Sequence, residues 1–218
     1  MKSAVKYEHL AHFRTSQEAN YREKEILIAL HGYGQLSEFF LRKLTPLFLE
    51  ERLIVVPEAT NYYYLQGFSG RVGANWMTKH ERESAILNNN NYLNAILNSI
   101  LMNYEYLPLI KILGFSQGAA TATRWLNQLD VSVDTLILWG GGFAHDLEMG
   151  RTAHQLEKTK CIIALGDKDE LITDESMSKQ DELIKAMDLK VELIRYPGGH
   201  DLDLNVLTHL FESQKVND

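Results

Sequence analysis

The sequence predicts an α/β protein in which a largely parallel β-sheet is covered by helices on both faces. Short, continuous apolar runs recur along the chain, and such runs are typical of strands that are buried on both sides. Stretches with helical spacing of apolar residues separate several of these runs. Strands that alternate with helices in this way favour βαβ units and therefore a parallel sheet.

The composition is that of a single globular domain. The chain has 218 residues, enough to bury one sizeable core, so we predict one domain over residues 1–218. The formal net charge of -7 argues against a nucleic-acid partner, because nucleic-acid binders usually carry a basic patch. The one cysteine, Cys161, cannot form an internal disulfide and lies in an apolar run, so we expect a buried core residue.

Neither a signal peptide nor a membrane-spanning segment is expected from the sequence. Residues 1–7 lack the apolar segment of a signal peptide, and no stretch is long and apolar enough to span a bilayer. We therefore expect a cytoplasmic protein without stable membrane insertion.

The first strands follow from two kinds of pattern. Residues 5–15 alternate between apolar and polar, which predicts a strand, although Leu10 falls on the polar side. Residues 25–30 and 53–56 are continuous apolar runs and predict buried strands. An amphipathic pattern predicts a helix between them, over about residues 37–50.

Residues 58–79 have neither helical nor strand periodicity, and aromatic residues and glycines crowd this stretch. A segment this long without regular structure is usually functional or disordered. Its many aromatic residues argue against disorder. Residues 80–103 return to helical spacing, with apolar side chains along one stripe, and predict a long helix.

The second half of the chain again alternates strands with helices. Apolar runs predict strands at residues 109–115, 134–139, 160–165 and 191–196. Helical patterns predict helices from the first of these strands to about residue 129, over residues 173–187, and in a short segment that ends near residue 211. A capping signal at Thr173 or Asp174 supports the start of the second of these helices.

A glycine-flanked serine lies where the strand 109–115 meets its helix, in the sequence Gly114-Phe115-Ser116-Gln117-Gly118. A serine on so sharp a turn has a strained backbone, so the positions two before and two after it must lack a side chain. This strand–turn–helix context is typical of a nucleophile elbow and predicts Ser116 as a nucleophile. The alternative is a glycine-rich turn whose serine only caps the helix.

Two further candidates, Asp169 and His200, also follow predicted strands. Reactive residues of parallel sheets belong at the carboxyl ends of strands. His200 would accept the proton of Ser116, and a buried carboxylate would orient the imidazole. Asp167 competes with Asp169 for the second role. The chain order of nucleophile, acid and base is that of α/β-hydrolases.

An anionic intermediate would need backbone N–H donors. Gln117, directly after the nucleophile, would supply one, and we expect the second from Tyr33 in the turn after strand 25–30. Gly32 lies in the same turn and is expected beside the substrate. His31 is expected to brace this turn rather than act as the base.

These residues resemble the phospholipase/carboxylesterase family of α/β-hydrolases, which includes acyl-protein thioesterases and is related to dienelactone hydrolases. The resemblance covers nearly the whole chain and rests on Leu30-His31-Gly32-Tyr33-Gly34, Val56-Pro57-Glu58, Gly114-Phe115-Ser116-Gln117-Gly118, Gly166-Asp167-Lys168-Asp169 and Gly199-His200. It implies an α/β-hydrolase fold with little or no separate cap domain. The family pattern Gly-x-x-Asp places the acid at the later aspartate and so selects Asp169.

The resemblance also implies a reaction. We expect a serine esterase that cleaves a small-molecule carboxylic ester through an acyl-enzyme, with neither a metal nor an organic cofactor. Phe68 and Trp76, in segment 58–79, are expected to line the substrate pocket, although these aromatics could instead cover the sheet edge. The alternatives are a lysophospholipase or acyl-protein thioesterase for long acyl chains, and a non-catalytic binding protein of the same fold. A homodimer is compatible with the family, but the sequence carries no interface signature.

Overall fold

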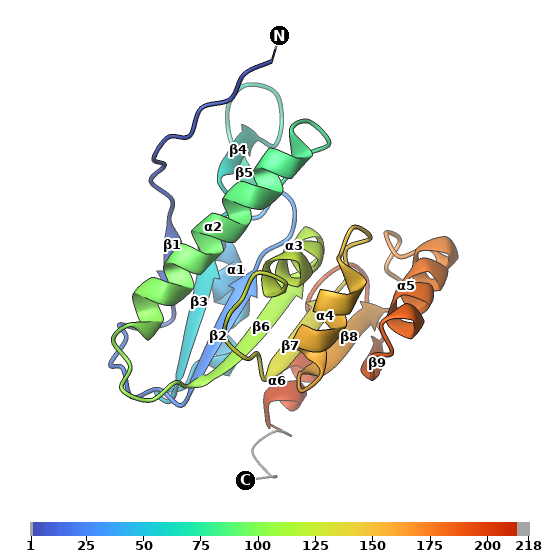
Figure 1. The fold of residues 1–218 in the computed structure, drawn as a ribbon. Helices are drawn as coiled ribbons and strands as arrows, with labels where there is room; N and C mark the ends of the chain where they lie inside the picture. Colours follow the sequence, from blue (N-terminus) through green and yellow to red (C-terminus); the bar gives the residue numbers. More distant parts are fainter. Residues whose placement is uncertain (1, 213–218) are drawn as a thin grey trace.

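A computed structural model describes residues 2–212 of the chain, and a seven-stranded sheet forms its centre (Figure 1). The strands lie in the order β1-β3-β2-β6-β7-β8-β9. Every neighbouring pair is parallel except β1 and β3. Their bounds are Phe13–Thr15 for β1, Glu25–Leu30 for β2, Arg52–Pro57 for β3, Leu109–Phe115 for β6, Thr135–Trp139 for β7, Lys160–Gly166 for β8 and Val191–Tyr196 for β9.

Helices cover both faces of this sheet, as predicted (Figure 1). The helices are α1 (Ser37–Lys43), α2 (Arg82–Leu101), α3 (Gln117–Leu126), α4 (Met149–Leu156), α5 (Asp174–Ala186) and α6 (Leu204–Glu212), with a short 3-10 helix at Thr45–Leu47. Side chains of α2, α3, α4 and α5 pack on one face, and those of α1 and α6 pack on the other. The protein therefore has the three-layer α/β-hydrolase architecture.

Burial on both faces explains why the strands read as continuous apolar runs. In β2, Ile26 and Ile28 point into the core under α2 and α3, whereas Leu27 and Ala29 point into the core under α1 and α6. Successive side chains of a strand point to opposite faces, so both sets must be apolar. Cys161 of β8 is buried in the first of these cores, as predicted, and burial raises the pKa of its thiol to about 11.

The predicted strand at residues 5–15 is wrong over most of its length, because β1 comprises only Phe13–Thr15. Its pairing with β3 begins at Phe13 and Pro57, where β3 ends. Beyond this point the backbone of His12 still accepts a hydrogen bond from Glu58 N–H, at 2.9 Å. The strand partner then runs out, and alternation alone cannot form a strand without a neighbouring backbone to bond.

The segment 58–79 is more regular than its sequence predicts. It forms a two-stranded antiparallel hairpin of β4 (Asn61–Tyr64) and β5 (Val72–Asn75), joined by a loop over residues 65–71. Glycine interrupts the side-chain pattern at position 73, where a Cβ would lie 2.6 Å from the Gly34 carbonyl oxygen. Hydrogen bonding between Gly34 N–H and the Ala74 carbonyl, at 2.8 Å, ties this hairpin to the turn after β2.

Most of the helices are shorter than their predicted spans. The first one ends at Lys43 rather than near residue 50, because Pro46 cannot continue an α-helix and residues Thr45–Leu47 form a 3-10 turn instead. The start of α5 is as predicted: the Thr173 hydroxyl accepts a hydrogen bond from Ser176 N–H at 3.1 Å, in a capping box. None of the helices in the described part of the chain combines the length and apolar composition needed to cross a bilayer.

Candidate active site

The backbone of Ser116 is strained in the way that a nucleophile elbow requires. This residue joins β6 to α3 with φ 54° and ψ -118°, a conformation that non-glycine residues rarely adopt. Two hydrogen bonds hold it: Ser116 N–H donates to the Trp139 carbonyl at 2.8 Å, and Ser116 O accepts from Ala119 N–H at 3.0 Å. The neighbouring strand and the first turn of the helix therefore impose the turn.

The two flanking glycines are sterically required. A Cβ on Gly114 would lie 2.5 Å from the Gly118 carbonyl oxygen, so the two ends of the turn touch. A Cβ on Gly118 would lie 2.2 Å from the Leu30 carbonyl oxygen at the end of β2. The prediction that these two positions must lack a side chain is thus confirmed. At Gly118 the backbone of β2 also leaves no room for one.

Gly118→Ala should destabilise the fold because the new methyl group meets rigid backbone rather than a movable side chain. We expect the free energy of unfolding to fall by about 1–3 kcal/mol or more. Gly150→Ala is the matched control, since its Cβ would lie 3.3 Å from the nearest atom, an Oε1 of Glu148. Chemical denaturation measures both variants. Equal stability of the two would contradict the close approach of α3 and β2.

The three residues predicted to form the reactive group lie together. His200 Nε2 is 2.8 Å from Ser116 Oγ, and His200 Nδ1 is 2.7 Å from Asp169 Oδ2. The side chain of Asp169 is fully buried, and its other oxygen accepts a hydrogen bond from Leu171 N–H at 3.0 Å. The side chain of His200 is 23% exposed, so solvent reaches the imidazole. Asp167, the competing acid, is exposed at the surface.

Two aromatic residues hold the loop that carries His200. Trp139 Nε1–H donates to the Tyr196 hydroxyl at 2.7 Å and to the Asp201 carbonyl at 3.0 Å. The Tyr196 hydroxyl in turn donates to the same carbonyl at 2.6 Å. Neither Trp139 nor Tyr196 was predicted from the sequence. The signal that could have found them is that each is the last, aromatic residue of a predicted strand.

The turn after β2 is closed by its own side chains. Gly32 N–H donates to Gln35 Oε1 at 2.9 Å, and Gln35 N–H donates to the Gly32 carbonyl at 3.3 Å. A Cβ on Gly32 would lie 3.2 Å from Ser116 Cβ, so this turn lies directly against Ser116. Tyr33 follows Gly32 in this turn, and the centroid of its ring is 5.3 Å from that of Tyr63 in the hairpin.

His31 braces this turn, as predicted. It is buried; its Nδ1 donates to the Gly32 carbonyl at 2.8 Å and its Nε2 accepts from Ala59 N–H at 3.1 Å, which assigns the neutral tautomer. Burial lowers the pKa of His31, so the imidazole remains uncharged. A base at this position would have no access to substrate.

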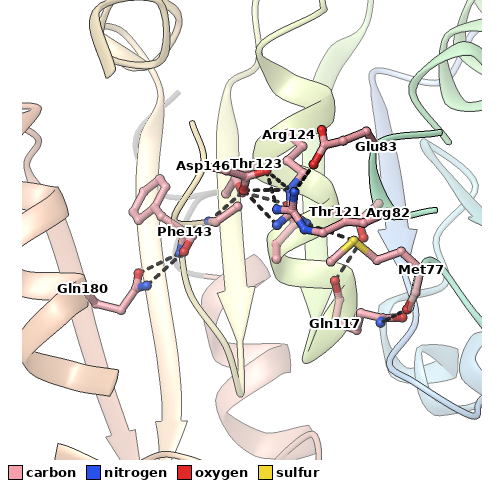
Figure 2. A network of polar contacts seen from close by, with 12 residues as sticks. Met77, Arg82, Glu83, Gln117, Thr121, Thr123, Arg124, Phe143, Asp146 and Gln180 are labelled. Carbon is pink, nitrogen blue, oxygen red and sulfur yellow. Dashed lines mark hydrogen bonds and ion pairs between the residues drawn. The ribbon is translucent and has the colours of Figure 1, made fainter. Parts of the chain in front are cut away.

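The side chain of Gln117 connects helix α3 to the segment after the hairpin. Its Oε1 accepts from Trp76 N–H at 2.8 Å, and its Nε2 donates to the Met77 carbonyl at 2.8 Å; Figure 2 shows the second bond. From the sequence, only the backbone N–H of Gln117 was expected to have a role. Its side chain also holds the backbone of Trp76 and Met77 in place.

The predicted pocket wall of Trp76 and Phe68 is corrected by the structure. Trp76 is fully buried, and its Nε1–H donates to the His31 carbonyl at 2.8 Å. It therefore supports the turn from inside the core and does not face substrate. Phe68 is 97% exposed in the loop between β4 and β5. The two residues lie far apart in environment because the segment folds into a hairpin. Trp76 follows the end of the hairpin in the core, and Phe68 lies in its loop in solvent.

A polar network ties α3 to its surroundings (Figure 2). The guanidinium of Arg124, on α3, donates to Asp146 Oδ1 at 2.9 and 3.0 Å, and Arg82 of α2 binds the same carboxylate. Burial raises the pKa of Asp146, but the hydrogen bonds from Arg124 and Arg82 outweigh burial and lower this pKa to about 2. Asp146 thus joins two helices to the loop after β7. No local pattern in the sequence indicates this link.

Two aspartates near the candidate site have structural roles. Asp203 caps α6, since its Oδ1 accepts from Asn205 N–H at 3.0 Å and Val206 N–H at 2.9 Å. Asp201 forms an ion pair with Lys43. Within residues 2–212, no group of three or more His, Cys, Asp and Glu side chains is arranged to hold a metal ion.

The family model described as "Serine hydrolase (FSH1)" matches residues 20–202, which is more than half of the chain and includes all three candidate residues. The protein belongs to the FSH1 serine hydrolase family. No curated protein sequence gives a significant match. The FSH1 assignment agrees with the sequence resemblance to esterases of the α/β-hydrolase fold.

Solved structures similar to this FSH1 family member include esterases and an acyl-protein thioesterase. Acyl-protein thioesterase 2 from Zea mays has a TM-score of 0.69 at 15% identity, covering 95% of this chain and 99% of that one. A phospholipase/carboxylesterase from Dyadobacter fermentans DSM 18053 has a TM-score of 0.68 at 21% identity, covering 94% and 98%. Esterase PE8 has a TM-score of 0.64 at 17% identity, covering 93% and 98%. At these identities the similarity concerns the fold.

Proposed function

We propose that this FSH1 serine hydrolase cleaves carboxylic esters through an acyl-enzyme, with Ser116 as nucleophile, His200 as general base and Asp169 as the orienting acid. The observation that carries the proposal is the continuous hydrogen-bonded chain from Ser116 Oγ through both nitrogens of His200 to Asp169 Oδ2, at 2.8 and 2.7 Å. A hydroxyl, an imidazole and a buried carboxylate in this order are what acyl transfer to serine requires.

Acylation uses His200 as base and then as acid. Ser116 Oγ attacks the carbonyl carbon of the ester while His200 Nε2 takes the hydroxyl proton. The tetrahedral intermediate then collapses, the bond to the alcohol oxygen breaks, and Nε2 returns the proton to that oxygen. Asp169 accepts the Nδ1–H hydrogen bond, keeps Nε2 free to receive the proton, and stabilises the imidazolium.

The negative charge of the intermediate falls on the former carbonyl oxygen. We assign its stabilisation to the backbone N–H groups of Gln117 and Tyr33, each of which would contribute about 2.7–4 kcal/mol. The close contact of Gly32 with Ser116 supports this assignment, because it brings the turn against the nucleophile. Rigid anchoring of the Gln117 side chain supports it too, since preorganised donors need no rearrangement during reaction.

Deacylation repeats these steps with water. His200 Nε2 takes a proton from a water molecule, whose oxygen attacks the acyl carbon, and the same proton then returns to Ser116 Oγ as the carboxylic acid leaves. The 23% exposure of the His200 side chain supports this step, because water must reach the imidazole. Both half-reactions consist of proton and acyl transfers among protein groups, the ester and water.

A thioester is the alternative substrate, because the same steps cleave a carbon–sulfur bond and one structural neighbour is an acyl-protein thioesterase. Turnover of matched oxygen and sulfur esters with one acyl chain separates the two. A non-catalytic role is disfavoured, since all three side chains of the triad are present and within hydrogen-bonding distance.

A fluorophosphonate probe tests the proposal, because it reacts with an activated serine. We expect covalent labelling of the folded wild-type protein and turnover of p-nitrophenyl acetate and butyrate. Ser116→Ala should lose both, whereas Ser132→Ala, at an exposed serine, should retain both. Labelling or turnover that is equal in wild type and Ser116→Ala would refute the proposal.

Cellular location and partners stay predictions. We propose a cytoplasmic enzyme that acts on a small-molecule ester and binds no nucleic acid, as the sequence indicates. Fractionation of a tagged full-length chain tests the location, and sedimentation analysis tests whether the enzyme forms a homodimer.

A further inference from the structure

Residues 74–77, which we call the bridging segment, lie between the two parts of the chain whose N–H groups are assigned to the oxyanion. The segment comprises the last two residues of β5 and the two residues that follow them. On one side it is hydrogen-bonded to the turn after β2, which carries Tyr33. On the other side it is hydrogen-bonded to Gln117, the first residue of α3. The bridging segment thus joins the turn to the helix.

Hydrogen bonds on both sides of Tyr33 connect the bridging segment to the turn. Gly34 N–H donates to the Ala74 carbonyl at 2.8 Å. The indole Nε1–H of Trp76 donates to the His31 carbonyl at 2.8 Å. The backbone before and after the Tyr33 N–H is therefore held by the same short segment.

The side-chain amide of Gln117 binds the bridging segment at two successive residues. Its Oε1 accepts from Trp76 N–H at 2.8 Å, and its Nε2 donates to the Met77 carbonyl at 2.8 Å; Figure 2 shows the second bond. The Gln117 carbonyl accepts from the Thr121 hydroxyl at 3.0 Å, within α3. The residue that carries the first N–H donor is thus fixed through its side chain as well as through its helix.

A buried asparagine of α2 holds the bridging segment from a third direction. Asn89 is 4% exposed, whereas the other members of the run Asn88–Asn91 are exposed or half-buried. Its Nδ2 donates to the Trp76 carbonyl at 2.8 Å. Asn61 of β4 donates its Nδ2 to the carbonyls of Asn75 and Trp76, at 3.0 and 3.2 Å. Burial of an amide is unfavourable unless it is hydrogen-bonded, so the contact of Asn89 fixes both partners.

Trp76 is held at its backbone and at its side chain. Its N–H, its carbonyl and its indole Nε1–H all form hydrogen bonds. Its ring is fully buried, with the centroid 5.1 Å from that of the His31 imidazole. A residue constrained at so many points moves only together with its partners. Trp76 therefore opposes any displacement of Gln117 relative to the turn after β2.

We propose that the bridging segment sets the separation between the two oxyanion donors. Its positioning residues are Trp76, Asn89 and the side chain of Gln117. This inference rests on the proposed esterase function. Donors stabilise an oxyanion when they are held about 2.7–3.1 Å from its oxygen, and this precision needs a rigid support. Trp76 and Asn89 are buried, so they act through the two backbone N–H groups and not on the ester itself.

Two substitutions test the positioning role. Gln117→Met removes both side-chain hydrogen bonds but keeps the backbone N–H, so it separates the two roles of this residue. Asn89→Leu removes the hydrogen bond to the Trp76 carbonyl. We expect each to lower kcat for p-nitrophenyl butyrate about 10- to 100-fold, because a small misplacement of the donors weakens transition-state binding. KM should change little, since the oxyanion is absent from the bound ester.

Matched controls remove similar hydrogen bonds at other places. Gln155→Met, on α4, breaks the bond from a side-chain amide to the Leu129 carbonyl. Asn94→Leu, on the same helix as Asn89, breaks the bond to the Trp125 indole. We expect both controls to be less stable in chemical denaturation and to keep the kcat of wild type.

A trifluoromethyl ketone with a butyl chain provides a readout that is specific for the oxyanion. Ser116 Oγ adds to its carbonyl carbon, the hydroxyl proton passes to His200, and the new oxyanion takes the place of that in the tetrahedral intermediate. Its inhibition constant should rise in the two variants by about the factor by which kcat/KM falls. It should stay unchanged in the two controls.

Gln117→Glu provides a second variant if Gln117→Met does not fold. Its carboxylate still accepts from Trp76 N–H but repels the Met77 carbonyl, whereas a protonated carboxyl can donate to that carbonyl. The loss of kcat relative to wild type should therefore be smaller at acidic than at neutral pH, and a loss independent of pH contradicts the contact.

The outcomes separate this inference from the proposed function. Folded variants with the kcat and the ketone affinity of wild type overturn the positioning role and leave the esterase. Equal losses in the controls overturn it as well, because they indicate general destabilisation. A wild-type protein that shows neither ester turnover nor labelling by the fluorophosphonate refutes the esterase and this inference with it.

Discussion

Ser116→Ala is expected to lower kcat for p-nitrophenyl butyrate by a factor on the order of 10⁵–10⁶. The change removes the nucleophile and leaves His200 and Asp169 in place. His200→Ala should cost about as much, because without its base the hydroxyl keeps its proton. The residues act as one unit, so the double variant should be no worse than either single variant.

Steady-state and single-turnover kinetics measure these losses. A rate above that in water should persist in all three variants, by roughly 10³–10⁴, because the backbone donors and the binding site remain. Ser132→Ala controls for the loss of a serine elsewhere. If the losses of Ser116→Ala and His200→Ala instead multiply in the double variant, the two side chains work independently and the hydrogen bond between them is not part of catalysis.

Asp169→Asn is expected to lower kcat by about 10⁴ with little change in the fold. The amide is nearly isosteric with the carboxylate, so the side chain should keep its hydrogen bond from Leu171 N–H. An amide that donates its N–H to His200 Nδ1 selects the wrong tautomer, in which Nε2 carries a proton and cannot accept one from Ser116. The expected change is therefore in kcat, with a much smaller change in KM.

Asp167→Asn is the matched control for this substitution. It lies two positions earlier in the same turn and is exposed, whereas Asp169 is buried. We expect its kinetics to stay close to wild type. The reverse result, a large loss at Asp167 and a small one at Asp169, would move the acid to the other aspartate and contradict the geometry of His200 Nδ1.

Much of the sheet was predictable because its strands are buried on both faces. The bounds of β6, Leu109–Phe115, and of β9, Val191–Tyr196, agree with those read from the apolar runs. Ser116, Asp169 and His200 were found for the same reason. Parallel strands point their carboxyl ends to one edge of the sheet, so a residue that follows a strand can be placed before the fold is known.

Segments with partners far away in the chain were predicted less well. The hairpin of β4 and β5 was not predicted because its strands are short and β5 includes a glycine. Glycine is needed at position 73 because the backbone there lies against Gly34, in a turn remote in the sequence. Trp76 was wrongly predicted to line the pocket because its contacts, too, are with a segment remote in the sequence. Its hydrogen bond to the backbone of His31 joins two segments that no local pattern relates.

The strands that are continuous apolar runs, the serine turn and the candidates Ser116 and His200 were determined by the sequence alone, since each depends on a pattern within a few neighbouring residues. The family pattern Gly-x-x-Asp added the choice of Asp169 over Asp167. Only the tertiary structure decided that Trp139 and Tyr196 hold the loop of His200, and that the hairpin of β4 and β5 is bonded to the turn after β2. Both depend on distances between segments remote in the chain. Such distances are set by how all the side chains pack together, and periodicity carries no information about them.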